Sequence, residues 1–392
     1  MRRQDWQALA KLGLSFLPGK VWKLASPHMW VVSEYRHLAR DNGYWMFRHI
    51  RLCHPEQRVY YPIAFDSPDY RVVSQFGNVI PFGGFRHYLL FWAADVQIGT
   101  TKCYGFPYRR ICEDLVQWNI HRFKYVFLNH GYTRGKSSIV DASETNYDLL
   151  LTCSEDDRKV IIEENGQLPE RVRTTGYARH DNLTNELFDS KRILVMPTWR
   201  KWIDYRLLTS KEELENNERL FLDSSYYLCW QAFLNDERLI ALLEKRGLTL
   251  VFYLHEYAQE YSRYFSSRSE RVNIATTDQY NIQDLLKSSA LLVTDYSSVC
   301  YDFGYMHRPV IYYQFDREEF ERRQYAPGEY FSYEEDGFGE VATSQDEVID
   351  LVFASAADGF VMGEKFAARV DDYFAFRDQR NCERVYDAIS TL

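Results

Sequence analysis

Side chains that can transfer protons or bind phosphate follow apolar runs at four places in the sequence. They are His130 after "KYVFLN", Thr198 and Arg200 after "RILVMP", His255 after "LTLVFYL", and Ser297 and Ser298 after "ALLVTDY". An imidazole can accept a proton from a hydroxyl near neutral pH. Hydroxyls, an imidazolium and a guanidinium can hold phosphate oxygens. Together, these residues predict group transfer on a nucleotide diphosphate.

The stretch "LLVTDYSSVCYDFGYMHRPVIYY", residues 291–313, predicts a strand, a loop, a short helix and a second strand. Ser297 and Ser298 fall where the helix should begin, so their hydroxyls and the N–H groups of the first turn would point the same way and suit a pyrophosphate. Asp295 could cap the helix or orient a basic neighbour, and Asp302 could reach a ribose hydroxyl. For a single helix, N-capping by serine explains the same residues.

The other three places also have simpler explanations when each is taken alone. A histidine at the end of a strand is more often structural, which applies to His130 and to His255. Arg200 lies next to tryptophans and could merely stack on them. Lys136, which follows His130 closely, and Arg179 are possible supporting residues. The convergence of hydroxyls, two histidines and an arginine at strand ends in both halves favours the functional interpretation.

The elements that must position these residues alternate between strand and helix. Strand and helix patterns recur every 20 to 30 residues, which predicts an α/β protein with parallel sheets. Such doubly wound sheets collect ligand groups at the carboxyl ends of their strands. The pattern restarts near residue 189, so we expect a segment at 1–28 and domains at 29–188 and 189–392. The last thirty residues predict a helix that crosses back over the first half.

Composition and charge narrow the class of protein. The chain has 392 residues, of which 46% are hydrophobic and 26% charged, as in folded globular proteins. The net charge of -9 argues against nucleic-acid binding. Seven cysteines without a C-x-x-C pair predict a reducing compartment, no disulfide framework and no zinc site. No acidic D-x-D pair stands in a convincing place, so we also expect no tightly bound metal.

Membrane association has one candidate segment. No apolar run approaches the roughly 18 residues that span a bilayer, and nothing resembles a cleavable signal, which predicts a location on the cytoplasmic side. Residues 1–24 predict an amphipathic helix with basic flanks. Its expected apolar face contains Trp6, Leu9, Ala10, Gly13, Phe16 and Leu17. This helix could lie in a membrane interface or pack on its own domain, and the sequence leaves both open.

The sequence resembles a known family. The run "DLLKSSALLVTDYSSVCYDFGYMHRPVIYYQFDREEF" closely resembles the signature of the CDP-glycerol glycerophosphotransferase family, which contains teichoic acid primases and polymerases and related capsule enzymes. Further matches occur in family order. They are "SEYRHLARDNGYWMF", "FLNHG" at 127–131, "TGYARHD" at 175–181, "MPTWR" at 196–200 and "YLHE" at 253–256. The resemblance covers most of the chain.

The resemblance implies a GT-B-like fold, with two Rossmann-like doubly wound domains facing a cleft, and peripheral attachment at the cytoplasmic face of the bacterial membrane. It implies transfer of a polyol phosphate from CDP-glycerol or CDP-ribitol to a lipid-linked glycan or polyol-phosphate acceptor, with release of CMP and no cofactor. By position, His130 resembles the proposed base for the acceptor hydroxyl. The expected donor-phosphate residues are His255, Ser297, Ser298, Thr198 and Arg200.

Two departures from the family pattern bear on the substrate. Glu256 replaces a proline beside His255, and Ala178 and His180 replace a proline and an asparagine around the shared Arg179. These changes leave open which polyol is used. A nucleotide-sugar glycosyltransferase or epimerase, and a non-catalytic membrane scaffold, are the alternative functions. The sequence does not separate a primase from a polymerase.

Overall fold

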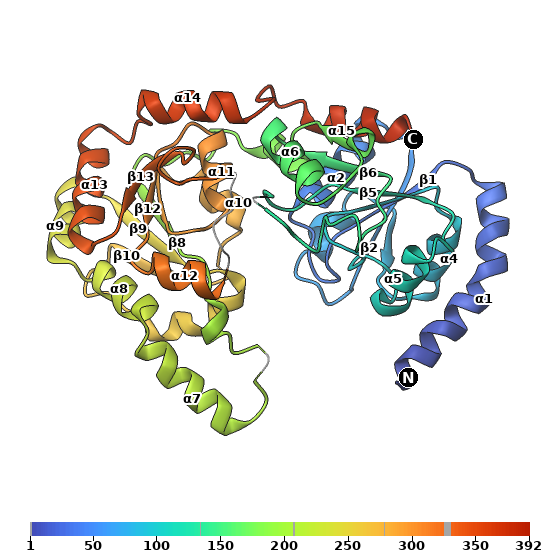
Figure 1. The fold of residues 1–392 in the computed structure, drawn as a ribbon, viewed down its shortest axis with the longest axis horizontal. Helices are drawn as coiled ribbons and strands as arrows, with labels where there is room; N and C mark the ends of the chain where they lie inside the picture. Colours follow the sequence, from blue (N-terminus) through green and yellow to red (C-terminus); the bar gives the residue numbers. More distant parts are fainter. Residues whose placement is uncertain (1, 134, 207, 278, 325–330) are drawn as a thin grey trace. The chain divides into compact units, whose positions relative to one another are not determined.

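The computed structural model describes residues 2–133, 135–206, 208–277, 279–324 and 331–392. The chain forms two compact units, each with its own parallel sheet (Figure 1). The first unit contains Met1–Asn182 and Tyr373–Leu392, and the second contains Leu183–Asp372. The chain thus passes to the second unit at residues 182–183, against an expected boundary at 188, and returns to the first unit at Tyr373.

Seven parallel strands form the sheet of the first unit, in the order β3-β2-β1-β4-β5-β6-β7. The strands are β1 (Met29–Ser33), β2 (Arg58–Ile63), β3 (Val79–Pro81), β4 (Val96–Gly99), β5 (Lys124–Phe127), β6 (Leu149–Thr152) and β7 (Val172–Thr174). The helices are α1 (Arg3–Ala25), α2 (Asn42–Cys53), α3 (Tyr70–Ser74), α4 (Phe85–Ala93), α5 (Arg109–Gln117), α6 (Glu155–Glu163), η1 (Pro169–Arg171), η2 (Ala178–Asn182) and α15 (Asn381–Ser390). Strands β1, β4 and β6 are buried along their whole length, as is typical of parallel strands covered by helices.

Six parallel strands form the sheet of the second unit, in the order β10-β9-β8-β11-β12-β13. The strands are β8 (Arg192–Met196), β9 (Thr249–Tyr253), β10 (Val272–Ala275), β11 (Leu291–Thr294), β12 (Val310–Tyr313) and β13 (Gly339–Ala342). The helices are η3 (Lys201–Ile203), α7 (Lys211–Leu222), α8 (Ser225–Leu234), α9 (Glu237–Arg246), η4 (Glu256–Tyr264), α10 (Ile282–Lys287), α11 (Val299–Tyr305), α12 (Arg317–Arg323), α13 (Gln345–Ala357) and α14 (Glu364–Tyr373). The chain order reverses between β8 and β11, which makes that gap the topological switch point of the sheet.

The last helix contributes to the core of the first unit. Side chains of α15 pack in one buried cluster with those of α2 and the central strands. The contributing residues of α15 are Cys382, Val385, Ala388 and Ile389. The first unit is therefore completed by residues that come after the whole second unit in sequence.

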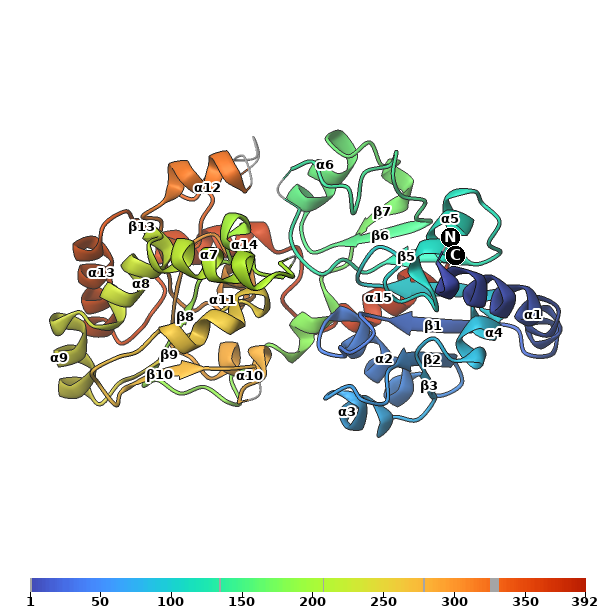
Figure 2. The same ribbon diagram turned by 90° about the horizontal axis from the view of Figure 1, so that it is seen from below.

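The N-terminal helix α1 packs along α4, and Figure 2 shows the two helices side by side. Gly19 allows the close approach, since a Cβ there would lie 2.8 Å from Cβ of Trp92. The indole N–H of Trp92 donates to the carbonyl of Leu12 at 3.0 Å. The predicted apolar face lies elsewhere on the helix, because Trp6 is 62% and Leu17 71% exposed. Apolar residues thus occupy both the packed and the exposed side of α1.

No helix in the described part of the chain combines the length and the apolar character that crossing a bilayer requires.

Candidate functional site

Three neighbouring strands of the second unit bring the predicted donor-site residues to one edge of the sheet. Strand β8 lies between β9 and β11, and all three are parallel, so their carboxyl ends share that edge. Thr198 and Arg200 follow β8, His255 follows β9, and the loop of Asp295, Ser297 and Ser298 follows β11. Ligands of open α/β sheets bind at such a switch point.

Arg200 lies fully buried between two carboxylates. Its Nη2 is 2.8 Å from Oδ2 of Asp295, and its Nε and Nη2 donate to Asp316 at 2.7 and 3.0 Å. Its Nη1 donates to the carbonyl of Thr198 at 2.6 Å. Most of the five guanidinium N–H groups are therefore committed to the protein. Because the guanidinium is fully buried and is already paired with two carboxylates, the geometry favours a positioning role for this side chain.

The electrostatics of this cluster keep Arg200 charged. Burial acts to lower the pKa of Arg200, but Asp295 and Asp316 outweigh it and raise the pKa above its ordinary value. Burial raises the pKa of Asp295, while Arg200 and the backbone N–H of Thr198 act in the opposite direction. Oδ1 of Asp295 also accepts the N–H of Thr198 at 2.8 Å. The cluster thereby ties the ends of β8 and β11 together.

His255 is held as a neutral ring. Its Nδ1 accepts the backbone N–H of Tyr257 at 3.1 Å, so in the neutral form the proton is on Nε2. Burial and the nearby Arg206 lower the pKa of His255 to about 4. The sequence prediction of an imidazolium therefore does not describe this conformation, in which the ring offers one neutral N–H donor. Glu256, the next residue along the chain, is exposed.

The serine loop has the predicted local structure. Strand β11, the loop and helix α11 occur in the expected order, and Ser298 is the residue before the first turn of α11. The hydroxyl of Ser298 makes no capping hydrogen bond, and its side chain is exposed. Oγ of Ser297 accepts the N–H of Val299 at 3.4 Å. Asp302 is half-buried on the first turn of the same helix.

His130 lies in the first unit, at the carboxyl end of β5. Its Nδ1 lies 3.0 Å from the carbonyl oxygen of Thr100, which can only accept, so Nδ1 carries a proton. In the neutral ring Nε2 is then unprotonated, and the side chain is exposed. Asn129 has a positive φ of 62°, and its Oδ1 accepts the N–H of His130 at 2.9 Å. This arrangement suits a general base.

Arg179 supports the loop that carries His130. Its Nη1 donates to the carbonyl of His130 at 3.3 Å and to Oδ1 of Asp41 at 3.1 Å. Its backbone N–H donates to Asn42, whose side-chain amide in turn donates to the carbonyl of Asn129 at 2.8 Å. Arg179 is buried, so it acts through the backbone of the loop.

Lys136, a predicted supporting residue, and His180, a departure from the family pattern, have other partners. His180 is buried, and its Nε2 lies 3.0 Å from the hydroxyl of Tyr132, so it packs inside the first unit. Lys136 is 75% exposed, and its Nζ lies 3.5 Å from Asp141. These contacts give His180 a structural place and leave Lys136 on the surface. The predicted residues thus fall into one group in the first unit and another in the second.

Sequence reasoning missed two partners of the site. Asp316 holds Arg200, and it lies just after strand β12. A search for polar side chains after this strand, like the search after the other strands, would have found Asp316. Thr100 holds His130 through a backbone carbonyl, for which the sequence carries no signal.

Comparisons with known proteins agree on one family. The model of the family described as CDP-Glycerol:Poly(glycerophosphate) glycerophosphotransferase matches residues 24–391. The minor teichoic acid biosynthesis protein GgaB of Bacillus subtilis (strain 168) is 30% identical over 93% of this chain. The teichoic acid ribitol-phosphate polymerase TarL of Staphylococcus aureus (strain NCTC 8325 / PS 47) is 23% identical over 72% of it. The chain spans 40% of the length of GgaB and 48% of the length of TarL.

Solved structures share the fold. The wall teichoic acid polymerase TagF superposes with a TM-score of 0.62 at 16% identity, over 99% of this chain and 97% of that one. A putative UDP-N-acetylglucosamine 2-epimerase from Listeria monocytogenes gives a TM-score of 0.57 at 14% identity, over 93% of this chain and 96% of that one. The predicted GT-B-like architecture of two doubly wound parts is thereby confirmed.

Proposed function

This chain belongs to the CDP-glycerol:poly(glycerophosphate) glycerophosphotransferase family, and from that membership we infer that it transfers a polyol phosphate from a CDP-polyol to a hydroxyl of a lipid-linked acceptor. We take glycerol phosphate as the transferred group and CMP as the product that leaves. The observation that carries the proposal is His130, an exposed imidazole whose Nδ1 is fixed on the carbonyl of Thr100 and whose Nε2 remains for a hydroxyl.

The proposed reaction is an in-line displacement at the β-phosphorus of the donor. The acceptor oxygen forms the new bond to phosphorus, its proton passes to Nε2 of His130, and the bond to the bridging oxygen breaks so that CMP leaves. Phosphoryl transfer depends on positioning and on stabilisation of charge. His255 and the serine loop supply neutral N–H and O–H donors for the diphosphate, while Arg200 keeps the strand ends in place. No cofactor is part of this mechanism.

CDP-ribitol is the second candidate donor. TarL and TarK, whose names describe ribitol-phosphate polymerases, are among the relatives of this chain at 23% and 25% identity. Among the solved structures that share this fold is one of TagF soaked with CDPG, which supports glycerol phosphate as the transferred group. Glu256 next to His255 could accept hydrogen bonds from hydroxyls of either polyol.

The test is CMP release from CDP-glycerol and CDP-ribitol in the presence of a lipid-linked acceptor analogue, with UDP-sugars as alternative donors. We expect release from one CDP-polyol, and a loss of about 100-fold or more in His130→Asn, because general bases contribute about 10²–10⁴-fold. His28→Asn is the matched control, since His28 is exposed and precedes β1, at the amino-terminal side of that strand. Turnover of a UDP-sugar, with no turnover of either CDP-polyol, would instead indicate a nucleotide-sugar enzyme.

We also propose that the chain acts at the cytoplasmic face of the membrane as a peripheral protein. The support is the exposed apolar side of α1, which includes Leu14 and Leu24 at 71% and 85% exposure. Basic residues accompany this helix, as in helices that lie on anionic lipid.

A further inference from the structure

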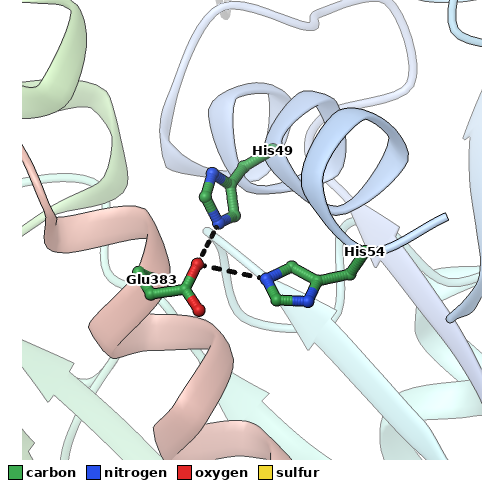
Figure 3. A group of neighbouring side chains, drawn as sticks. All are labelled: His49, His54 and Glu383. Carbon is green, nitrogen blue, oxygen red and sulfur yellow. Dashed lines mark hydrogen bonds and ion pairs between the residues drawn. The ribbon is translucent and has the colours of Figure 1, made fainter. Parts of the chain in front are cut away.

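Two histidines and a glutamate converge between α2 and α15 in the first unit (Figure 3). His49 lies on α2, His54 is the residue after the end of that helix, and Glu383 lies on the first turn of α15. Nε2 of His49 is 2.9 Å and Nε2 of His54 is 3.1 Å from the same oxygen, Oε2 of Glu383. Among the described residues, this is the one group of histidine, cysteine and acidic side chains whose ligand atoms cluster in this way.

We propose that His49, His54 and Glu383 bind one divalent transition-metal ion, with Zn²⁺ as the best fit. In a tetrahedral zinc site with bonds of about 2.0–2.2 Å, neighbouring ligand atoms lie about 3.3 Å apart. The two distances to Oε2 are close to that value, and all three ligand atoms lie within 4.8 Å of one another. Two imidazoles and one carboxylate suit zinc, cobalt, nickel or copper better than magnesium or calcium.

The surroundings of His54 fit a metal ligand. Its Nδ1 lies 3.7 Å from Oε1 of Glu56, and its ring stacks on Tyr386 with centroids 3.6 Å apart at 12°. A metal-bound imidazole typically directs its second N–H to a carboxylate. Glu56 lies near that nitrogen but beyond hydrogen-bond distance, and stacking on Tyr386 holds the ring.

The site is formed before any ion arrives. Helices α2 and α15 pack through a shared apolar cluster that includes Phe47, Ile50 and Val385, so the ligand-bearing backbones are already held. The side chains of His49, His54 and Glu383 remain 19%, 17% and 37% exposed. An ion can therefore enter from solvent and keep a water as its fourth ligand. A bound ion would fasten the segment that returns from the second unit to the first.

Sequence analysis did not predict this site because its residues are far apart in the sequence. The two histidines are five residues apart, but the carboxylate comes more than three hundred residues later, and no C-x-x-C pair accompanies them. The prediction of no zinc site rested on the absence of a C-x-x-C pair, and that of no tightly bound metal on the absence of a convincing D-x-D pair. This proposal departs from both predictions.

The test is a titration of chelator-treated full-length chain with Zn²⁺ alone, monitored by calorimetry, and with Co²⁺ alone, monitored by its visible absorption. We expect one ion per chain, and binding at least about 100-fold weaker in His49→Ala and in Glu383→Gln, since even residues behind the ligands contribute about 10–100-fold. His307→Ala is the matched control, because His307 also pairs with a carboxylate, Asp371 at 2.9 Å, in the second unit. Zn²⁺ should raise the Tm of the unchanged chain and of His307→Ala only.

Several results would overturn the proposal. The first is no stoichiometric binding by the unchanged chain, which would leave a hydrogen-bonded cluster of two histidines and a glutamate. The second is undiminished binding in Glu383→Gln. This near-isosteric variant keeps the contact between the helices, so it still provides the test if His49→Ala fails to fold. The third is binding of Mg²⁺, titrated alone by calorimetry in the same way, that is as tight as binding of Zn²⁺. None of these readouts depends on the transferase activity.

Discussion

At the residue scale, the two strand-end histidines are held in opposite tautomers by backbone groups. A carbonyl oxygen fixes the proton of His130 on Nδ1, whereas a backbone N–H fixes that of His255 on Nε2. One ring therefore presents a lone pair and the other presents a donor. Base catalysis needs the first, and binding of a phosphate oxygen needs the second. Backbone contacts alone thus give two identical side chains different chemistry.

Replacement of Arg200 by lysine should destabilise the chain strongly. A single ammonium cannot satisfy Asp295 and Asp316 in the geometry that the guanidinium fork uses. Breaking a buried ion cluster costs about 3–5 kcal/mol. Urea denaturation of Arg200→Lys, compared with the exposed control Arg268→Lys, measures this. An unchanged free energy of unfolding with weaker CDP-glycerol binding would instead mean that Arg200 contacts the donor directly.

The buried His87 should make stability depend on pH. Burial lowers its pKa to about 3, and its Nδ1 accepts the N–H of Gly83 at 3.1 Å. The unfolded chain binds a proton near pH 6.5 and the folded chain does not, so the contribution of His87 is complete above pH 6.5 and is lost as pH falls toward 3. The slope is at most about 1.4 kcal/mol per pH unit.

The measurement is the free energy of unfolding between pH 4 and pH 7 for the unchanged chain and for His87→Asn. Asparagine keeps an acceptor for Gly83 but does not titrate, so the difference between the two chains should grow as pH rises. Parallel curves would show that His87 is protonated equally in both states.

At the element scale, α1 should bind membranes through the side that it leaves exposed. Deleting residues 1–24 would also uncover the face of α4 that α1 covers, so point changes are the cleaner experiment. Leu14→Gln and Leu17→Gln alter residues that are both 71% exposed, and we expect both to weaken binding to anionic liposomes with little change in Tm. Leu12→Ala, in the packed face, should lower Tm by loss of core contacts. The measurement is sedimentation with vesicles. Equal binding of the two glutamine variants and the unchanged chain would refute the prediction.

The same scale shows which parts of the site were accessible from sequence. Apolar runs with polar residues at their ends located the carboxyl ends of β5, β8, β9 and β11, because parallel strands bury both faces and the chain leaves the core after them. The burial of Arg200 could not be predicted, because the sequence does not show which carboxylates lie beside its guanidinium in the folded chain. The sequence predicted an apolar face on α1 but left open whether that face is packed or exposed. The packed side depends on Gly19 fitting against Trp92, a contact between residues distant in sequence.

At the scale of the whole molecule, the predicted donor residues all lie within Leu183–Asp372, and His130 does not. Helix α14 belongs with this unit, since Arg369 donates to the carbonyls of Gly337 and Glu334 at 2.7 and 2.8 Å. We therefore expect a fragment of residues 183–372 to fold cooperatively and to bind CDP-glycerol within about tenfold of the full chain, without releasing CMP. Calorimetry and a CMP assay on the fragment measure the two properties.

Ser298→Ala makes this experiment specific to the proposed phosphate contact. The hydroxyl of Ser298 makes no capping bond, so its removal should leave the stability of the fragment unchanged. A hydrogen bond to a charged group contributes about 1.5–3 kcal/mol, which predicts about 10–100-fold weaker donor binding. A folded fragment that fails to bind would mean that the first unit supplies essential donor contacts. Binding that is insensitive to Ser298→Ala would instead place the diphosphate away from the serine loop, because removing a hydroxyl that contacts the diphosphate must weaken donor binding.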